Sequence, residues 1–224
     1  MNDLNFHSPF KLDRAIKISI YWLLSVAMIP VSLGAQSNYA KELKLHRNQV
    51  KKEHLKDPRS PLQKSDLQKL KYFSANEDFV IEAQYEPMVK SDSVIMPTSS
   101  GKLKYFVKAA RVSFDVDGAR YQLFLYKPAS AAEGHRSLFL PFYDLTNGTE
   151  TYGGGRYMDL EAPDSGKTIL KLDFNKSYNP WCAYSDGFNC PIPPEDNRLT
   201  LSVWAGEKMY KGKRRGGSKS SNKK

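Results

Sequence analysis

The chain has 224 residues, of which 40% are hydrophobic and 26% are charged, and its formal net charge is +10. This length and balance are typical of a soluble globular protein of one or two domains, and they exclude a disordered chain, a collagen and a multi-span membrane protein. The 13 Tyr, 11 Phe, 14 Gly and 13 Pro are scattered along the chain, which favours short strands joined by turns over a long helical bundle.

Residues 1–35 have the layout of a secretory signal peptide. Three cations between positions 11 and 17 precede an uncharged apolar run at 18–33, and Gly34 and Ala35 provide a small-residue exit. The apolar run is shorter than the roughly 20 residues of a spanning helix. We therefore expect cleavage after Ala35 and export to the periplasm or the medium, with no transmembrane span in the mature chain. An uncleaved anchor is the alternative.

Two helices are predicted before the first strand. The polar segment 37–57 ends at Pro58 and carries a thin helical stripe at steps of three and four residues, made of Tyr39, Leu43, His46, Val50 and His54. We expect the two histidines to pack on this helix face, because no acidic or nucleophilic residue accompanies them at a fixed offset. A second short helix is predicted from Ser65, with Gln68 in the capping-box position.

From Phe79 onward the apolar period changes to two, which is typical of strands. Asp117-Gly118 predicts a tight hairpin turn. About eight strands are expected, at 79–85, 112–116, 121–125, 137–143, 157–160, 168–174 and 199–204, with short apolar runs at 93–96 and 103–107. The sequence therefore predicts a mainly β domain over residues 36–206, either an antiparallel β-sandwich or a partly closed β-barrel with one or two N-terminal helices.

A polar segment at 140–160 is the first candidate site. Three consecutive glycines precede Arg156, so the segment suits an anion pocket in which the guanidinium and the glycine amides bind the ligand. The alternative is a glycine bulge at a barrel corner, with Arg156 paired to Asp144, Glu150 or Asp159. The candidates from this segment are Asp144, Glu150, Arg156 and Tyr157.

A segment at 173–198 lacks regular structure over more than twenty residues and is the second candidate site. In an exported protein its cysteines, Cys182 and Cys190, are expected to form a disulfide; a metal site is the alternative, although no His lies nearby. The functional interpretation is a pocket wall, and the structural one is an ordered loop that covers one barrel end. Its polar and aromatic candidates are Asp173, Asn175, Tyr178, Asn179, Tyr184, Glu195 and Asn197.

The C-terminal segment 207–224 holds eight Lys or Arg residues against one Glu, so it supplies +7 of the net charge. Its glycines, serines and polar residues predict a disordered tail. The tail either contacts anionic surfaces or only improves solubility. The rest of the chain is close to neutral, so specific nucleic-acid binding is not expected.

Several long motifs resemble the bacterial and archaeal family of uncharacterised domains numbered 1684. They are DPRSPL at 57–62, LFLPFYDLTNGTETYGGGRY at 138–157, DFNKSYNP at 173–180, CAYS at 182–185, CPIPPE at 190–195 and AGEK at 205–208. The resemblance extends from about His46 to Lys208 and implies a single domain with no established activity or site residues. It also implies members without export signals, for which the disulfide is not a necessity. The signal peptide and the basic tail depart from the family.

Three functions are compatible with these observations. The first is an exported protein that binds a small polar or anionic ligand where the Arg156 strand and the cysteine segment meet. The second is a glycoside-type hydrolase that uses two of Asp144, Glu150, Asp173 and Glu195. The third is an envelope module without a ligand. No catalytic, nucleotide-binding or metal motif occurs, so no cofactor and no metal are expected.

Overall fold

The computed structural model describes residues 32–89, 93–132 and 134–216. It divides into two units, 1–38 and 39–224. Only the start of a helix, residues 32–38, is described in the first unit, so the predicted signal peptide falls largely outside the described residues. The fold below is that of the second unit.

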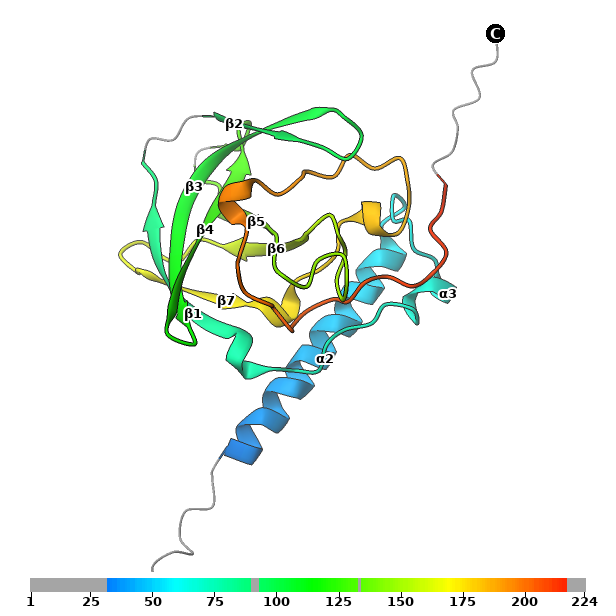
Figure 1. The fold of residues 1–224 in the computed structure, drawn as a ribbon, viewed down its shortest axis with the longest axis horizontal. Coiled ribbons are helices and arrows are strands. Elements are labelled where there is room, and N and C mark those ends of the chain that lie inside the picture. Colours follow the sequence, from blue (N-terminus) through cyan, green and yellow to red (C-terminus); the bar gives the residue numbers. More distant parts are fainter. Residues whose placement is uncertain (1–31, 90–92, 133, 217–224) are drawn as a thin grey trace, which may run out of the picture. The chain divides into compact units, whose positions relative to one another are not determined.

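Seven strands form one antiparallel sheet in the order β6-β5-β4-β3-β1-β7, and β2 pairs with β3 beside this path. Figure 1 shows the sheet curling on itself, with β6 and β7 as its two end strands. The predicted mainly β fold with N-terminal helices is confirmed, and of the two predicted architectures the curled sheet is the partly closed barrel. The strands are β1 (Val80–Pro87), β2 (Ser93–Pro97), β3 (Leu103–Val116), β4 (Ala119–Pro128), β5 (Ser137–Phe142), β6 (Arg156–Glu161) and β7 (Ile169–Asp173).

Strand β3 runs without a break from Leu103 to Val116, whereas the sequence predicts an apolar run at 103–107 and a separate strand at 112–116. Its first part pairs with β2 and its second part with β1, and its register to β4 shifts between Lys108 and Ala110. Such a bulge bends a strand without ending it. The Asp117-Gly118 turn is confirmed, with φ values of 51° and 76°, and Val116 lies opposite Ala119.

The main hydrophobic core combines buried residues of the sheet with the C-terminal segment 199–205. Leu199, Val203 and Ala205 are buried in it, but the predicted strand at 199–204 does not form. Leu199 and Leu201 bond to the backbone of residues 143–145, but side chains bind the rest of the segment: Asp144 Oδ1 accepts the Val203 N–H at 3.3 Å, and Arg156 donates to the Val203 and Ala205 carbonyls.

Helix α2 (Ser32–Lys56) confirms the predicted N-terminal helix, and its stripe residue Leu43 is 1% exposed. The second helix, α3 (Lys64–Leu67), is one turn long and begins earlier than predicted. Its capping residues are Gln63 and Asp66, since the Gln63 N–H donates to Asp66 Oδ2 at 3.1 Å. No helix within residues 32–89, 93–132 and 134–216 has the length and hydropathy of a membrane span. Four short 3-10 turns complete the elements: η1 (Glu77–Phe79), η2 (Phe174–Lys176), η3 (Trp181–Ala183) and η4 (Glu195–Asn197).

The domain extends beyond the predicted boundary at residue 206. Glu207 is 2% exposed, the Tyr210 ring packs edge-on against Tyr184, and the Arg215 N–H donates to the Tyr184 carbonyl at 3.0 Å. Arg215 also pairs with Asp66 at 2.8 Å. Residues 207–215 are therefore a strap across the domain surface, because they carry a buried polar group and a packed aromatic ring as well as charges.

Candidate functional site

A cavity of about 620 Å³ lies between helix α2 and the two end strands of the sheet, and we call it the seam cavity. Strand β6 contributes residues 158–161, strand β7 contributes Lys171 and Asp173, and α2 contributes five residues between His46 and His54. The cavity thus sits where the curled sheet fails to close, and the mouth of a barrel is a common place for a ligand site.

The edge of β6 presents unpaired peptide groups to the seam. Tyr157 exchanges two backbone hydrogen bonds with Tyr178, at 2.9 and 3.0 Å, on the side of β6 away from β5. Peptide groups of alternate residues in a strand point to the same side. The peptide groups of Asp159 and Glu161 therefore face the same way as those of Tyr157, and neither has a backbone partner there among the described residues.

Strand β7 has the equivalent arrangement on the opposite wall. The Tyr85 N–H donates to the Thr168 carbonyl at 2.7 Å, which places the groups of even-numbered β7 residues toward β1. Those of Lys171 and Asp173 point away from β1, and both residues line the cavity. Two bare sheet edges therefore face one concave space.

The cavity floor is apolar and aromatic. Met158 is 2% exposed, and Leu160, Tyr72 and Trp181 complete the floor together with Tyr178. The Trp181 ring packs edge-on against Phe188, with 5.1 Å between ring centroids. An apolar floor with a few fixed polar groups is the usual composition of a small-molecule site.

At one end of the cavity, Asp173 fixes helix α2 to the sheet. Its Oδ1 accepts the Tyr39 hydroxyl at 2.7 Å and the Asn175 N–H at 3.2 Å, and its Oδ2 lies 3.3 Å from Lys176 Nζ. Burial, and then the hydrogen bond to Asp173, raise the pKa of Tyr39. Asp173 is 5% exposed, and its Oδ2 forms no hydrogen bond among the described residues.

Arg47 lies beside this carboxylate. Its guanidinium stacks over the Tyr72 ring at 4.6 Å, and its Nε and Nη2 are buried without a hydrogen-bond partner in the described part of the chain. Burial lowers the pKa of Arg47, and the nearby Tyr72, Tyr39 and Asp173 partly oppose that effect. A cation held in this way can orient a polar ligand group without moving.

The predicted helix-face histidines both line the cavity. Burial lowers the pKa of His46 and of His54, and Lys176 lowers that of His46 further. Both imidazoles are therefore neutral at pH 7. His54 Nδ1 lies 3.2 Å from Ser60 Oγ, and its ring lies edge-on to Tyr184. This packing agrees with the structural interpretation of the two residues.

The opposite rim carries acidic side chains. The Tyr178 hydroxyl donates to Asp159 Oδ2 at 2.7 Å, and burial followed by this carboxylate raises the pKa of Tyr178 well above its ordinary value. Glu53 on α2 accepts a hydrogen bond from Gln49. Glu53, Asp159 and Glu161 form no ion pair within the described residues.

Of the predicted site residues, the structure brings Asp173, Asn175 and Tyr178 to the cavity. Arg156 lies elsewhere, in the core, with 0% exposure. Its Nη2 is 2.7 Å from Asp144 Oδ2, which is the alternative arrangement considered for this residue. The preceding Gly155 has a φ of +83°, and a Cβ there would lie 2.7 Å from the Phe142 carbonyl oxygen, so this position favours glycine.

Two other predicted residues, Asn179 and Tyr184, surround a carboxylate that sequence reasoning placed in the tail. Glu207 accepts the Tyr184 hydroxyl at 2.7 Å and the Asn179 N–H at 3.1 Å. Burial raises the pKa of Glu207 to about 7, although these hydrogen bonds oppose the shift. The cluster joins the strap 207–215 to the cysteine segment.

The remaining candidates have separate structural partners. Glu195 pairs with Arg198 at 2.6 Å on the surface, Glu150 lies 3.8 Å from Lys208, and the Tyr157 hydroxyl donates to the Pro191 carbonyl. Asn197 donates to the carbonyls of Phe124 and Pro141 and accepts the Phe124 N–H. Only Asp173 among the four proposed acid–base carboxylates lines the cavity, so they do not form the pair that a glycosidase requires.

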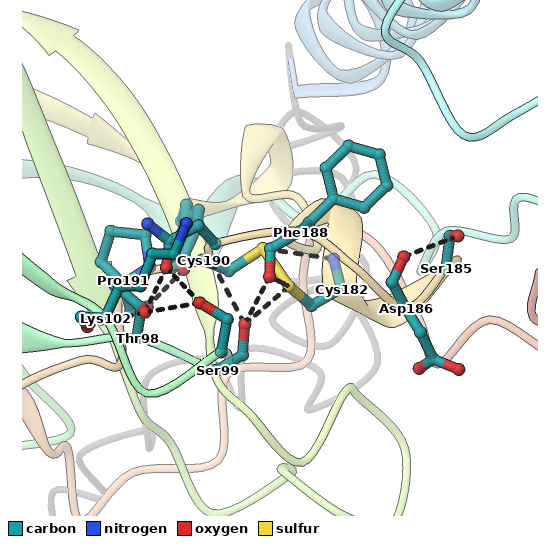
Figure 2. The surroundings of a disulfide bond; sticks show 12 residues. Thr98, Ser99, Lys102, Cys182, Ser185, Asp186, Phe188, Cys190 and Pro191 are labelled. Carbon is teal, nitrogen blue, oxygen red and sulfur yellow. Dashed lines mark hydrogen bonds between the residues drawn. A yellow bond between two sulfur atoms is a disulfide. The ribbon is translucent and has the colours of Figure 1, made fainter. Parts of the chain in front are cut away.

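The cysteine segment is stapled by the disulfide. Cys182 and Cys190 are bonded, with their Cα atoms 6.3 Å apart. Figure 2 shows Ser99 beside this bond, where its hydroxyl donates to the Phe188 carbonyl at 3.0 Å and the Ser99 N–H donates to the Cys190 carbonyl at 3.0 Å. No group of three or more His, Cys, Asp and Glu side chains within the described ranges has the arrangement of a metal site.

Comparisons with known proteins identify the domain. A family model described as a protein of unknown function (DUF1684) matches residues 65–208. The chain belongs to this family. A solution NMR structure of an uncharacterised protein from Haloarcula marismortui is 36% identical, with a TM-score of 0.62, and the match covers 78% of this chain and 96% of that one. No curated protein matches.

The DUF1684 match includes β6, β7 and Trp181, but it begins after helix α2. The sheet edges and the aromatic floor of the seam cavity therefore belong to the matched region, whereas Arg47, His46 and His54 precede it. Sequence reasoning missed Arg47, Tyr72 and Asp159 as site residues. The helical stripe His46-Val50-His54 was the available signal, since it showed which face of α2 meets the domain.

Proposed function

We propose that this DUF1684 protein binds a small polar ligand in the seam cavity. The observation that carries the proposal is one concave space of about 620 Å³ that combines an aromatic floor, two bare strand edges and the fixed charges Arg47 and Asp173. The Nε and Nη2 atoms of the stacked Arg47 guanidinium have no hydrogen-bond partner among the described residues, and Asp173 Oδ2 has only its ion pair with Lys176.

Binding is favoured over hydrolysis by the carboxylate geometry. Asp144 is paired with Arg156 in the core, and Glu195 and Glu150 have surface cations as partners. A glycosidase needs an acid and a base on either side of one bond. Of the four carboxylates predicted for that role, only Asp173 lines the seam cavity, and there it anchors Tyr39.

A thermal-shift screen of the chain from residue 36 onward, against metabolites and envelope sugars, tests the proposal. A ligand present at 100 times its Kd stabilises the fold by about 2.7 kcal/mol, or roughly 5–10 °C in Tm for a domain of this size. Val50 lines the cavity, whereas Leu55 on the same helix is 50% exposed and does not. Val50→Trp should abolish the shift for a true ligand, and Leu55→Trp should retain it. A ligand that stabilises both variants equally binds elsewhere and contradicts the proposal.

We further propose that the protein is exported and that residues 1–35 are its signal peptide. The charged, apolar and small-residue order of that segment supports export, and so does the Cys182–Cys190 disulfide, which persists in oxidising compartments. Expression of the full chain followed by N-terminal sequencing should give Gln36 as the first residue of the secreted form. A full-length cytoplasmic product would contradict export. Residues 217–224 of the predicted basic tail lie outside the described residues, and their contact with anionic surfaces stays a prediction.

A further inference from the structure

The two strand edges at the seam present rows of backbone N–H and C=O groups. A compact polar molecule is too short to pair with a whole row. On the β6 side, the peptide groups of Asp159 and Glu161 follow directly after the Tyr157–Tyr178 bridge. Donors and acceptors therefore alternate along the edge at the spacing of a strand. Such an edge is a template for an extended chain, which pairs with it by main-chain hydrogen bonds.

The Tyr157–Tyr178 bridge shows that this edge already accepts a partner. Tyr178 pairs with Tyr157 of β6, whereas the residues before it, 174–176, form the η2 turn that follows β7. Beyond that point the edge is open, and the cavity lies beside it. An added strand would continue the pairing past Tyr178, along residues 159–161.

The charge of the cavity indicates which kind of extended peptide would bind there. Lys176 is paired with Asp173, whereas Arg47 and Lys171 form no ion pair among the described residues. These two cations share the cavity with three acidic residues that also form no ion pair there: Glu53, Asp159 and Glu161. The open part of the cavity therefore has a net negative charge, with one acidic group on α2 and two on β6.

We propose that the ligand of the seam cavity is a short basic peptide, which binds in extended conformation as an added strand on β6. The proposal rests on the proposed binding function of this cavity and narrows its ligand class. Main-chain hydrogen bonds to residues 159–161 hold the peptide, Lys or Arg side chains meet the acidic rim, and alternate apolar side chains pack on the Tyr178 and Trp181 rings.

The test uses the chain from residue 36 onward and three acetylated, amidated pentapeptides. The first is Val-Lys-Val-Lys-Val, the second replaces both lysines by glutamate, and the third keeps the side chains of the first but carries N-methyl groups on alternate amides. Calorimetry gives the affinity, and two-dimensional NMR of ¹⁵N-labelled protein locates the site. The basic peptide should bind and shift the amide signals of Asp159 and Glu161. The acidic and the N-methylated peptides should bind at least tenfold more weakly.

Charge variants provide the matched comparison. Glu53→Gln with Glu161→Gln removes two rim charges, and Glu42→Gln with Glu86→Gln removes two exposed charges outside the cavity. The rim pair should weaken the basic peptide about three- to tenfold, because exposed ion pairs are individually modest, and the control pair should have little effect.

Three results would overturn the inference, and they separate it from the proposed function. If the N-methylated peptide binds as well as its parent, strand addition is wrong. If acidic and basic peptides bind equally, the charge argument is wrong. If no peptide binds, but a metabolite from the thermal-shift screen shifts the same amide signals, the cavity binds ligands of another class and only the peptide inference fails.

Discussion

The buried pair between Arg156 and Asp144 gives the sharpest prediction about what holds this fold together. Both side chains have 0% exposure, and Arg156 Nη2 lies 2.7 Å from Asp144 Oδ2. The same guanidinium donates to the carbonyls of Val203 and Ala205, which belong to the segment that fills the core in place of a strand. Arg156→Met therefore removes the counter-ion of a buried carboxylate and the partners of two backbone carbonyls.

The expected cost is about 3–5 kcal/mol, which is the usual effect of removing one partner from a buried ion pair. For a domain of this size, each kcal/mol lowers Tm by roughly 2–4 °C, so the variant should melt about 6–20 °C below the parent. Adding Asp144→Asn should recover part of the loss, because the uncompensated charge disappears while the amide oxygen still accepts the Thr146 N–H.

Urea denaturation of the two single variants and the double variant measures this coupling as a double-mutant cycle. We expect a coupling of at least about 2 kcal/mol. Arg111→Met is the control, since Arg111 pairs with Glu86 on the surface and should change stability by less than about 1 kcal/mol. If Arg156→Met costs no more than the control, or if the two single effects simply add, the structural role of this pair is refuted.

Three further predictions concern local features. Reduction of the Cys182–Cys190 disulfide, or its replacement by serines, should cost about 2.5 kcal/mol because the loop is short, and melting curves that coincide with and without reductant would contradict this. In urea titrations, Gly155→Ala should destabilise the fold by at least about 1 kcal/mol more than Gly148→Ala. Both glycines have a positive φ, but only Gly155 has atoms within 3 Å of an added Cβ. Equal losses of stability would contradict the close packing at Gly155. Burial raises the pKa of Glu207 in the folded protein to about 7, above its ordinary 4.5. Its contribution to the free energy of unfolding is therefore fully present below pH 4.5 and falls by up to about 3 kcal/mol as the pH rises to 7. Glu207→Gln should remove this fall from a plot of stability against pH, and an unchanged fall would mean that other groups cause it.

Structural features that neighbouring residues determine, such as most strands and the hairpin turn, were predictable from the sequence. The period-two alternation from Phe79 and the Asp117-Gly118 turn placed most strands, because each reflects burial on one sheet face or a backbone angle that few residues adopt. The apolar segment 199–204 was misassigned as a strand. Its side chains alternate as a strand would require, but only Leu199 and Leu201 bond to the backbone of 143–145, and Val203 is bonded by the side chains of Asp144 and Arg156, which no local pattern reveals.

The candidate site was predictable only in part. Asp173, Asn175 and Tyr178 stood out as polar residues in a long loop beside a strand, and they do line the cavity. Arg156 also lies in a polar, glycine-rich segment, yet its side chain points into the core. Whether it faces the core or a pocket depends on its partner Asp144, twelve residues away. Arg47 lies in a polar helix far from the sheet in sequence, and only the tertiary docking of α2 brings it to the site.

Amide hydrogen exchange at the seam tests the central claim most directly. The measurement compares the backbone N–H groups of Asp159 and Glu161 in the free protein and with the ligand found by screening. Our account predicts that exchange at these two positions slows at least tenfold on binding, while β2 (Ser93–Pro97), the other strand beside the main path, is unchanged. Unaltered exchange at 159, 161 and the other cavity-lining residues, with protection only outside the cavity, would show that the seam cavity is not the ligand site.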